Sequence, residues 1–162
     1  MPPRSSPFRY NNLKGVQRSL AKDATEFGLR KFCPRMMKFM TVRVVGSNEY
    51  LNRHNLFAEC EYVDDYPYDR QFKIYISVAL DPYNFLETMM HELVHVKQFA
   101  KGEMKDYARD SKHIRWHKEK INLESVEYMN LPWEIEAHAL EKPLAHEFLD
   151  FHPEWRQLIV KS

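Results

Sequence analysis

Residues 91 to 95 read His-Glu-Leu-Val-His and place two imidazoles and a carboxylate at a spacing that suits metal chemistry. In a helix, His91 and His95 lie one turn apart and within about 40° of each other, so both rings can reach one ion. Glu92 falls beside this pair, near enough to take a proton from a metal-activated water. The pattern therefore predicts a zinc site with two histidine ligands and Glu92 as catalytic base.

The residues around this pattern predict a buried helix. Asp81 suits its N-cap, Pro82 its first helical position and Gly102 its C-cap. Apolar residues recur along the segment at helical spacing: Phe85, Met89, Leu93, Val96 and Ala100. Polar side chains buried there without partners would cost on the order of several kcal/mol. A bound metal would be one such partner.

A third ligand is expected from the segment LPWEIEAHALEKP, residues 131–143. Pro132 suits the start of a second helix, and Pro143 suits a kink or its end. On a helical wheel Glu136 falls within an apolar arc, formed with Trp133, Ile135, Ala137, Ala139 and Leu140. An acidic side chain directed into the core predicts either a metal ligand or a buried pair with a histidine or arginine. The opposite arc, expected to face solvent, holds Glu134, His138 and Glu141.

The sequence HELVH resembles the helix motif of the HExxH zinc metallopeptidases, the zincins. It is similar to the gluzincin branch, most closely to small phage and bacterial metallopeptidases with PWEIEA after the motif, and more loosely to the ImmA/IrrE peptidases. The resemblance covers roughly residues 72–142. It implies His91, His95 and Glu136 as zinc ligands and Glu92 as general base. It also implies a small sheet before the helix, with an edge strand at the substrate cleft.

A second candidate for the third ligand lies in DSKHIRWHKE, where His113 is followed by Trp116. This arrangement resembles SprT-like proteases, which include enzymes that act on proteins crosslinked to DNA, although Ile114 stands where those proteins have glycine. His117 and, more weakly, His138 are further candidates. The alternative functions are thus a SprT-like DNA-associated protease that uses His113, or a metal-stabilised structural or binding protein without turnover. Tyr128, His113 and His117 are candidates to stabilise an oxyanion.

The rest of the chain predicts an α+β fold, a small zincin-like domain. Residues 13–32 are expected to form a helix, 64–69 a turn, residues around 113–123 an exposed hairpin, and 144–160 a C-terminal helix or helix pair. Three strands are expected, at 39–46, 55–63 and 71–80. They predict a mostly antiparallel sheet with the HExxH helix packed on it. Residues 1–12 are expected to be a flexible tail, and 13–162 a single domain.

Composition limits the compartment and the partners. The 162 residues carry 44% hydrophobic residues and a net charge of +1, which suits one domain and argues against a nucleic-acid partner. The N-terminal segment lacks the apolar stretch of a signal peptide, and no stretch has the length of a membrane span. Cys33 and Cys60 are expected to be free thiols in a reducing compartment. These features predict a cytoplasmic protein, in the host cytoplasm if phage-encoded, whose partner is a peptide or protein substrate.

Overall fold

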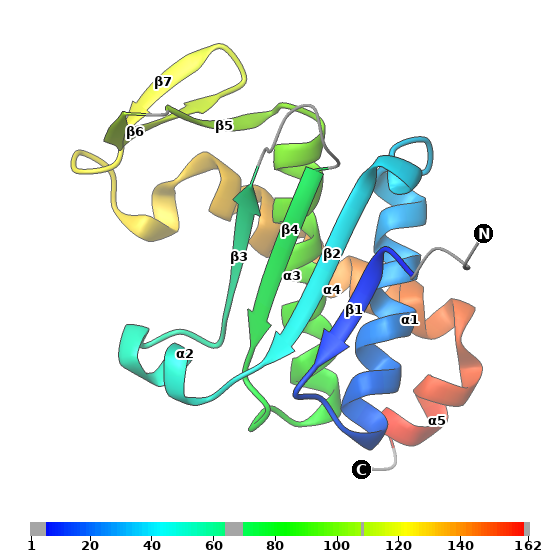
Figure 1. Cartoon of the computed structure of the whole chain (residues 1–162). Coiled ribbons are helices and arrows are strands. Elements are labelled where there is room, and N and C mark those ends of the chain that lie inside the picture. The colour runs from blue at the N-terminus through cyan, green and yellow to red at the C-terminus, as the bar shows by residue number, and fades with distance from the viewer. Residues whose placement is uncertain (1–5, 64–69, 108, 161–162) are drawn as a thin grey trace.

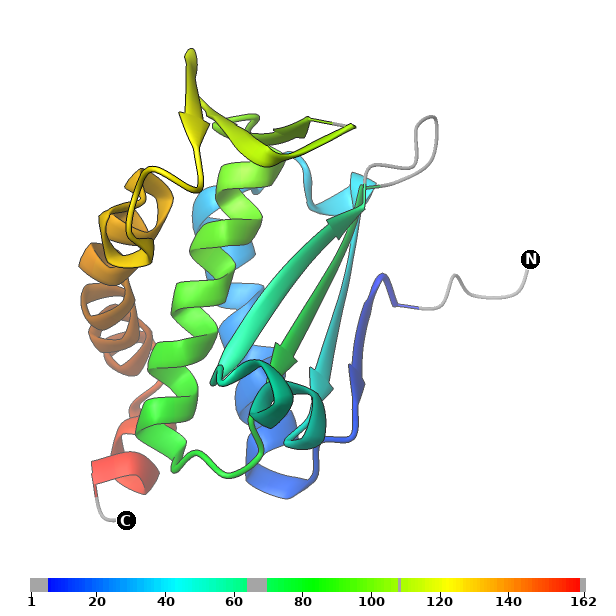
Figure 2. The same ribbon diagram turned by 90° about the vertical axis from the view of Figure 1, so that its left-hand side faces the viewer.

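The computed structural model of the chain describes residues 6–63, 70–107 and 109–160. Figures 1 and 2 show three layers: a sheet, then a pair of helices on one face of it, then a further helix behind that pair. The sheet contains β1 (Phe8–Asn11), β2 (Met40–Gly46), β3 (Ala58–Val63) and β4 (Arg70–Ile76) in the order β1-β2-β4-β3. The helices are α1 (Gly15–Phe32), α2 (Glu49–His54), α3 (Pro82–Ala100), α4 (Pro132–Phe151) and α5 (Pro153–Val160).

The fold is mixed α and β as expected, but the expected three-stranded, mostly antiparallel sheet is wrong. β1 pairs with β2 and β2 with β4 in parallel, and only β3 runs antiparallel to its neighbour β4. The parallel pairing of β1 and β2 follows from α1, because a helix between two strands returns the chain to the starting edge of the sheet. β3 is left as the edge strand beside α3.

The first strand lies inside the segment that was expected to be a flexible tail, so that expectation is wrong for residues 8–11. These residues pair with Val42–Val45 of β2. Phe8 and Tyr10 are half-buried and pack against the main core. Burial of these two side chains explains why the segment forms a strand. Residues 1–5 lie outside the described part of the chain.

The expected helices at 13–32 and 82–101 and the three expected strands are confirmed, with shifts of one to four residues at their ends. The backbone N–H of Asn84 donates to the Asp81 side chain at 3.1 Å, so Asp81 is the N-cap of α3. The core alternates along the strands, and its largest buried side chains there are Met40, Phe72, Ile74 and Ile76. They share one core with the buried apolar residues of α3, which packs beside β3 and β4. The predicted turn at 64–69 lies outside the described residues.

A second, three-stranded antiparallel sheet follows α3, with strands β5 (Met104–Tyr107), β6 (Asp110–Trp116) and β7 (Glu119–Asn122). The hairpin of β6 and β7 was expected, whereas β5 was not. Met104, Ile114 and Trp116 pack against Leu131 and Trp133 at the start of α4. This small core fixes the entry into α4.

Within the described part of the chain, no helix combines the length and apolar character that a membrane crossing requires. Cys33 and Cys60 are both free, as the sequence predicts.

Candidate metal centre

Helix α3 presents the HExxH residues toward α4, the helix behind it. His91, Glu92 and His95 are 8%, 5% and 8% exposed, so all three are removed from bulk water. Their neighbours on α3 pack into the main core, including Met90, Leu93 and Val94. The helix therefore holds these three polar groups in a fixed position at the contact between α3 and α4.

Glu134, in the first turn of α4, meets both imidazoles. One of its carboxylate oxygens lies 3.1 Å from Nε2 of His91, and the other lies 3.3 Å from Nε2 of His95. The two Nε2 atoms are themselves 3.1 Å apart. Four potential ligand atoms, two ring nitrogens and two carboxylate oxygens, thus lie close together.

The outer nitrogens of the same two rings are already in use. Nδ1 of His91 donates to Oε2 of Glu141, and Nδ1 of His95 donates to Oε1 of Gln98, each at 2.8 Å. Gln98 is oriented by its own amide, whose Nε2 donates to the backbone oxygen of Trp133 at 3.0 Å. With a proton on each Nδ1, a neutral ring turns the lone pair of its Nε2 inward. Two lone pairs and a carboxylate within 3.3 Å of one another repel unless a proton or a metal ion lies between them.

The donor set fits a zinc ion. Tetrahedral zinc with bonds of about 2.0–2.1 Å to nitrogen or oxygen holds its ligand atoms about 3.3 Å apart. The separations of 3.1, 3.1 and 3.3 Å among His91, His95 and Glu134 are close to this value. Two imidazoles and one carboxylate are also a ligand set of catalytic zinc sites, which leave the fourth position open.

The pKa values of His91 and Glu134 also show that the site favours positive charge. Burial lowers the pKa of His91, but hydrogen bonds to Glu134 and Glu141 and the charge of Glu92 outweigh burial and raise this pKa to about 9. Burial raises the pKa of Glu134, but its bonds from His91 and His95 outweigh this and hold the pKa well below its usual range. Burial raises the pKa of Glu92 to about 7, although His95 and His91 oppose the change.

The structure does not bring Glu136, the expected third ligand, to the histidines. Its Oε1 lies 2.6 Å from Nζ of Lys97 and accepts from Nε2 of Gln98 at 3.3 Å. Glu136 thus reaches His95 only through Gln98. The expectation that Glu134 faces solvent is wrong, because that residue is 5% exposed, and Ile135, expected in the core, is 54% exposed.

The reason for this difference lies in the length of α4. The helix passes through Pro143 and continues to Phe151, so its buried face is set by residues beyond the expected end. Trp133, Ala137, Leu144 and Phe148 are buried at spacings of one and two turns. Because these residues face the core, the buried side of α4 differs from the side that residues 131–143 alone predict. Glu134 lies on this buried side.

The alternative ligands occupy other positions. His113 lies on β6, where its Nδ1 donates to Asp110 at 2.8 Å, and His117 stands in the β6–β7 turn with a positive φ of 52°. Neither lines the pocket beside the HExxH residues. Among the described residues, His113 and His117 thus lie outside the contacts that join His91, His95 and Glu134.

His138 lies at the mouth of the site. One ligand atom from each of His91, Glu134 and His138 lies within 4.8 Å of the other two, so these three residues could also hold a metal ion. The His138 side chain is 39% exposed, however, and its Nδ1 lies 3.2 Å from Glu141. The contacts among His91, His95 and Glu134 are shorter, at 3.1–3.3 Å, and these three residues are buried, which favours His95 over His138 as a ligand. Glu141, expected to face solvent, is 17% exposed and joins His91 to His138.

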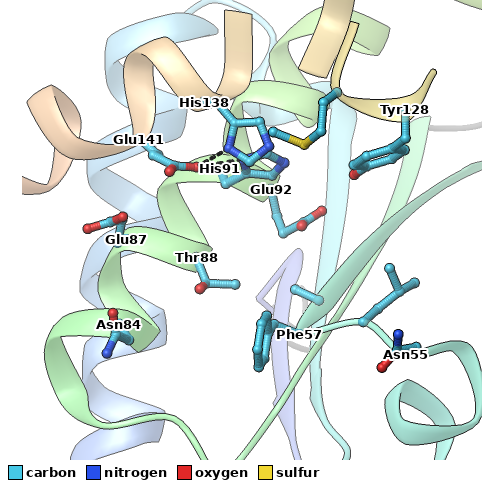
Figure 3. Close-up of a pocket in the computed structure, with 13 residues that line it drawn as sticks. Asn55, Phe57, Asn84, Glu87, Thr88, His91, Glu92, Tyr128, His138 and Glu141 are labelled. Carbon is cyan, nitrogen blue, oxygen red and sulfur yellow. Dashed lines mark hydrogen bonds and ion pairs between the residues drawn. The ribbon is translucent and has the colours of Figure 1, made fainter. Parts of the chain in front are cut away.

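A pocket of about 320 Å³ opens on the Glu92 side of this cluster (Figure 3). It runs between α3, the start of the edge strand β3 and the segment η2 (Tyr128–Asn130). Thirteen residues line it: Asn55, Leu56, Phe57, Ala58, Asn84, Glu87, Thr88, His91, Glu92, Tyr128, Met129, His138 and Glu141. The pocket gives a ligand access to Glu92 and to the imidazole ring of His91.

Comparison with known proteins identifies no relative: no protein-family model, no curated protein and no solved structure matches this chain. The function must therefore be inferred from the geometry of the residues themselves.

Proposed function

We propose that the chain is a zinc-dependent metallopeptidase in which His91, His95 and Glu134 hold the ion and Glu92 is the general base. One observation carries this proposal: both Nε2 atoms, with their tautomers set from outside, lie within 3.3 Å of the Glu134 carboxylate. A buried carboxylate against two imidazoles needs positive charge beside it, which a bound zinc ion would supply. When bound, zinc would lower the pKa of a water molecule and polarise the scissile carbonyl.

Glu92 supports a hydrolytic function because of where it lies. Its side chain follows directly after a ligand on α3 and lines the pocket, between the histidines and the apolar side of the cleft (Figure 3). In this position the carboxylate can accept a proton from the attacking water and return it to the leaving amine. A site with a merely structural metal needs neither an acidic neighbour nor an open pocket.

Tyr128 is the best candidate to stabilise the oxyanion. Of the three residues that the sequence suggested for this role, Tyr128 lines the pocket with Glu92, whereas His113 and His117 do not. Burial and the neighbouring Glu134 carboxylate raise the pKa of Tyr128, so its hydroxyl keeps its proton near neutral pH and remains a donor.

The edge strand supports a peptide substrate. β3 is the outer strand of its sheet, and Ala58 at its start lines the pocket. An extended peptide can pair with the outer edge of such a strand, which would hold the scissile bond beside Glu92. Small-molecule hydrolysis would not require this neighbouring edge.

The direct test is the substitution Glu92→Gln, assayed for zinc content and for cleavage of a mixed peptide library. We expect zinc to be retained and the rate to fall by a factor of about 10² or more, because the base is lost while the ligands remain. The exposed Glu119, on the β6–β7 hairpin, supplies the matched control Glu119→Gln, for which no change is expected. A parent protein that binds zinc and cleaves no peptide would instead favour the non-catalytic alternative.

A further inference from the structure

Four exposed apolar side chains gather around the proposed active-site pocket. Leu56, Phe57, Tyr128 and Met129 are 37%, 71%, 55% and 59% exposed, and all four line it. They come from two separate segments, the turn before β3 and η2. Exposed apolar groups that converge on one pocket, rather than being scattered singly, indicate contact with an apolar part of a ligand.

The turn that carries two of these side chains is fixed by its backbone. Asn55 adopts the left-handed conformation that ends α2, with φ 55°. The N–H of Leu56 donates to the oxygen of Leu51 at 3.0 Å, and the oxygen of Phe57 accepts from the N–H of Ser77 at 2.9 Å. The apolar wall is thus formed before a ligand arrives, which lowers the entropy cost of binding.

The opposite side of the pocket is acidic. Asn84 and Glu87 lie one turn apart on α3, and Glu141 faces them from α4, whereas Phe57 and Tyr128 lie across from them (Figure 3). No lysine or arginine is among the described residues that line the pocket. Both histidine bonds to Glu141 end on Oε2, so among the described contacts Oε1 keeps its acceptor capacity.

The negative charge on this side would persist after zinc binds. A divalent cation would offset the charges of Glu92 and Glu134, which lie at the centre of the site. Glu87 and Glu141 would remain as carboxylates on the outer wall. An acidic side chain of a substrate would be repelled there, and a lysine or arginine would be attracted.

We propose that this cleft selects peptides that carry a bulky apolar side chain on one side of the scissile bond and a basic side chain on the other. The inference rests on the proposed peptidase function and adds its substrate class. Leu56, Phe57 and Met129 contact the apolar side chain, and Glu87 is the main determinant for the basic one, since Glu141 already holds two histidines.

The test uses zinc-loaded parent protein and a peptide set with a constant apolar position and lysine, norleucine or glutamate at the charged position. Norleucine keeps the length of the lysine stem and removes its charge. We expect kcat/KM to fall in the order lysine, norleucine, glutamate, by about fivefold at each step, as for a partly exposed ion pair. Equal kcat/KM values of the parent for the three peptides would overturn the inference.

Two variants of Glu87 sharpen the result. Glu87→Gln should bring the ratio of lysine to norleucine peptides close to one while cleavage of the norleucine peptide is kept. Glu87→Lys should reverse the preference toward the glutamate peptide. The control Glu119→Gln makes the same charge change on an exposed hairpin outside the pocket and should leave the ratio unchanged.

The apolar wall is tested with Phe57→Ala. Its loss should lower kcat/KM by about tenfold for peptides with phenylalanine or leucine at the constant position, and much less for alanine. Equal loss of kcat/KM for all peptides would contradict selection by this wall.

The outcomes separate the substrate class from the peptidase function. If the parent cleaves peptides and Glu92→Gln abolishes cleavage, but neither peptide series shows a preference, the substrate class is wrong and the peptidase function stands. If nothing is cleaved, the peptidase function itself fails.

Discussion

Gln98 and His95 are joined by a 2.8 Å hydrogen bond from the ring nitrogen Nδ1 to the side-chain oxygen Oε1. The amide nitrogen of the same Gln98 donates to the backbone oxygen of Trp133, in the first turn of α4. One buried, uncharged side chain thus sets the tautomer of a proposed ligand and ties it to the helix that supplies Glu134. The orientation of His95 is therefore coupled to the packing of α3 on α4.

We predict that Gln98→Leu lowers zinc affinity by about 10- to 100-fold, because His95 loses the acceptor that orients its ring. Competition with a chromophoric chelator measures the affinity. Gln157→Leu, on the exposed face of α5, is the matched control and should leave the affinity unchanged. Equal affinity of Gln98→Leu and parent would show that this bond does not support a metal ligand.

The pair of Lys97 with Glu136 predicts a stability effect without a metal effect. Lys97 Nζ lies 2.6 Å from Glu136 and 2.7 Å from Glu103, and all three side chains are largely buried. We expect Lys97→Met to lower the free energy of unfolding by about 2 kcal/mol, because two carboxylates lose their partner. Urea unfolding measures this, with exposed Lys101→Met as control. Loss of zinc from Lys97→Met, with stability unchanged, would mean that Glu136 belongs to the metal site.

The position of Glu134 shows where the sequence was informative about α4. The grouping of Glu134, His138 and Glu141 on one arc is seen in the structure, where the three residues follow one another along the side of α4 that meets His91. Residues 131–143 could not show that this arc faces α3 rather than solvent. The buried residues that orient the helix include Leu144 and Phe148, which lie beyond that segment. Pro143 suggested an end to the helix, yet a proline can be tolerated inside a long packed helix when tertiary contacts offset its cost.

Removal of the metal should loosen the contact between α3 and α4. Binding to the folded state alone stabilises it by about 4 kcal/mol when free zinc exceeds its Kd a thousandfold. We therefore predict that a chelator lowers the Tm of the parent protein and that added zinc restores it. Glu134→Ala should show little response to either addition. A parent Tm that is insensitive to zinc and to chelator would argue against a shared ion between the two helices.

Gly46, at the end of β2, tests the placement of the first strand. A Cβ at this position would lie 2.3 Å from the backbone oxygen of Asn12 and 2.7 Å from Val78. Because a backbone oxygen cannot swing away, we expect Gly46→Ala to cost about 2 kcal/mol or more of unfolding free energy, measured by urea titration. The exposed Ser19→Ala on α1 should change it little. A neutral Gly46→Ala would mean that residues 8–12 do not pack against β2.

The sheet illustrates a different limit of sequence patterns. Residues 40–46 and 70–76 alternate clearly between buried and less buried positions, so both were recognisable as strands. Residues 8–11 have only two half-buried side chains and follow Pro7, which is too little for a periodic signal. Without that strand the helix over residues 15–32 has no partner strand before it, and the parallel crossover that governs the sheet cannot be inferred.

The most direct test of the central claim is the zinc content per chain of the parent, Glu134→Ala and Glu136→Ala, measured after dialysis against buffered zinc. We predict one zinc per chain in the parent and in Glu136→Ala, and an empty site in Glu134→Ala. Zinc retained by Glu134→Ala and lost from Glu136→Ala, or no zinc bound by the parent, would contradict it.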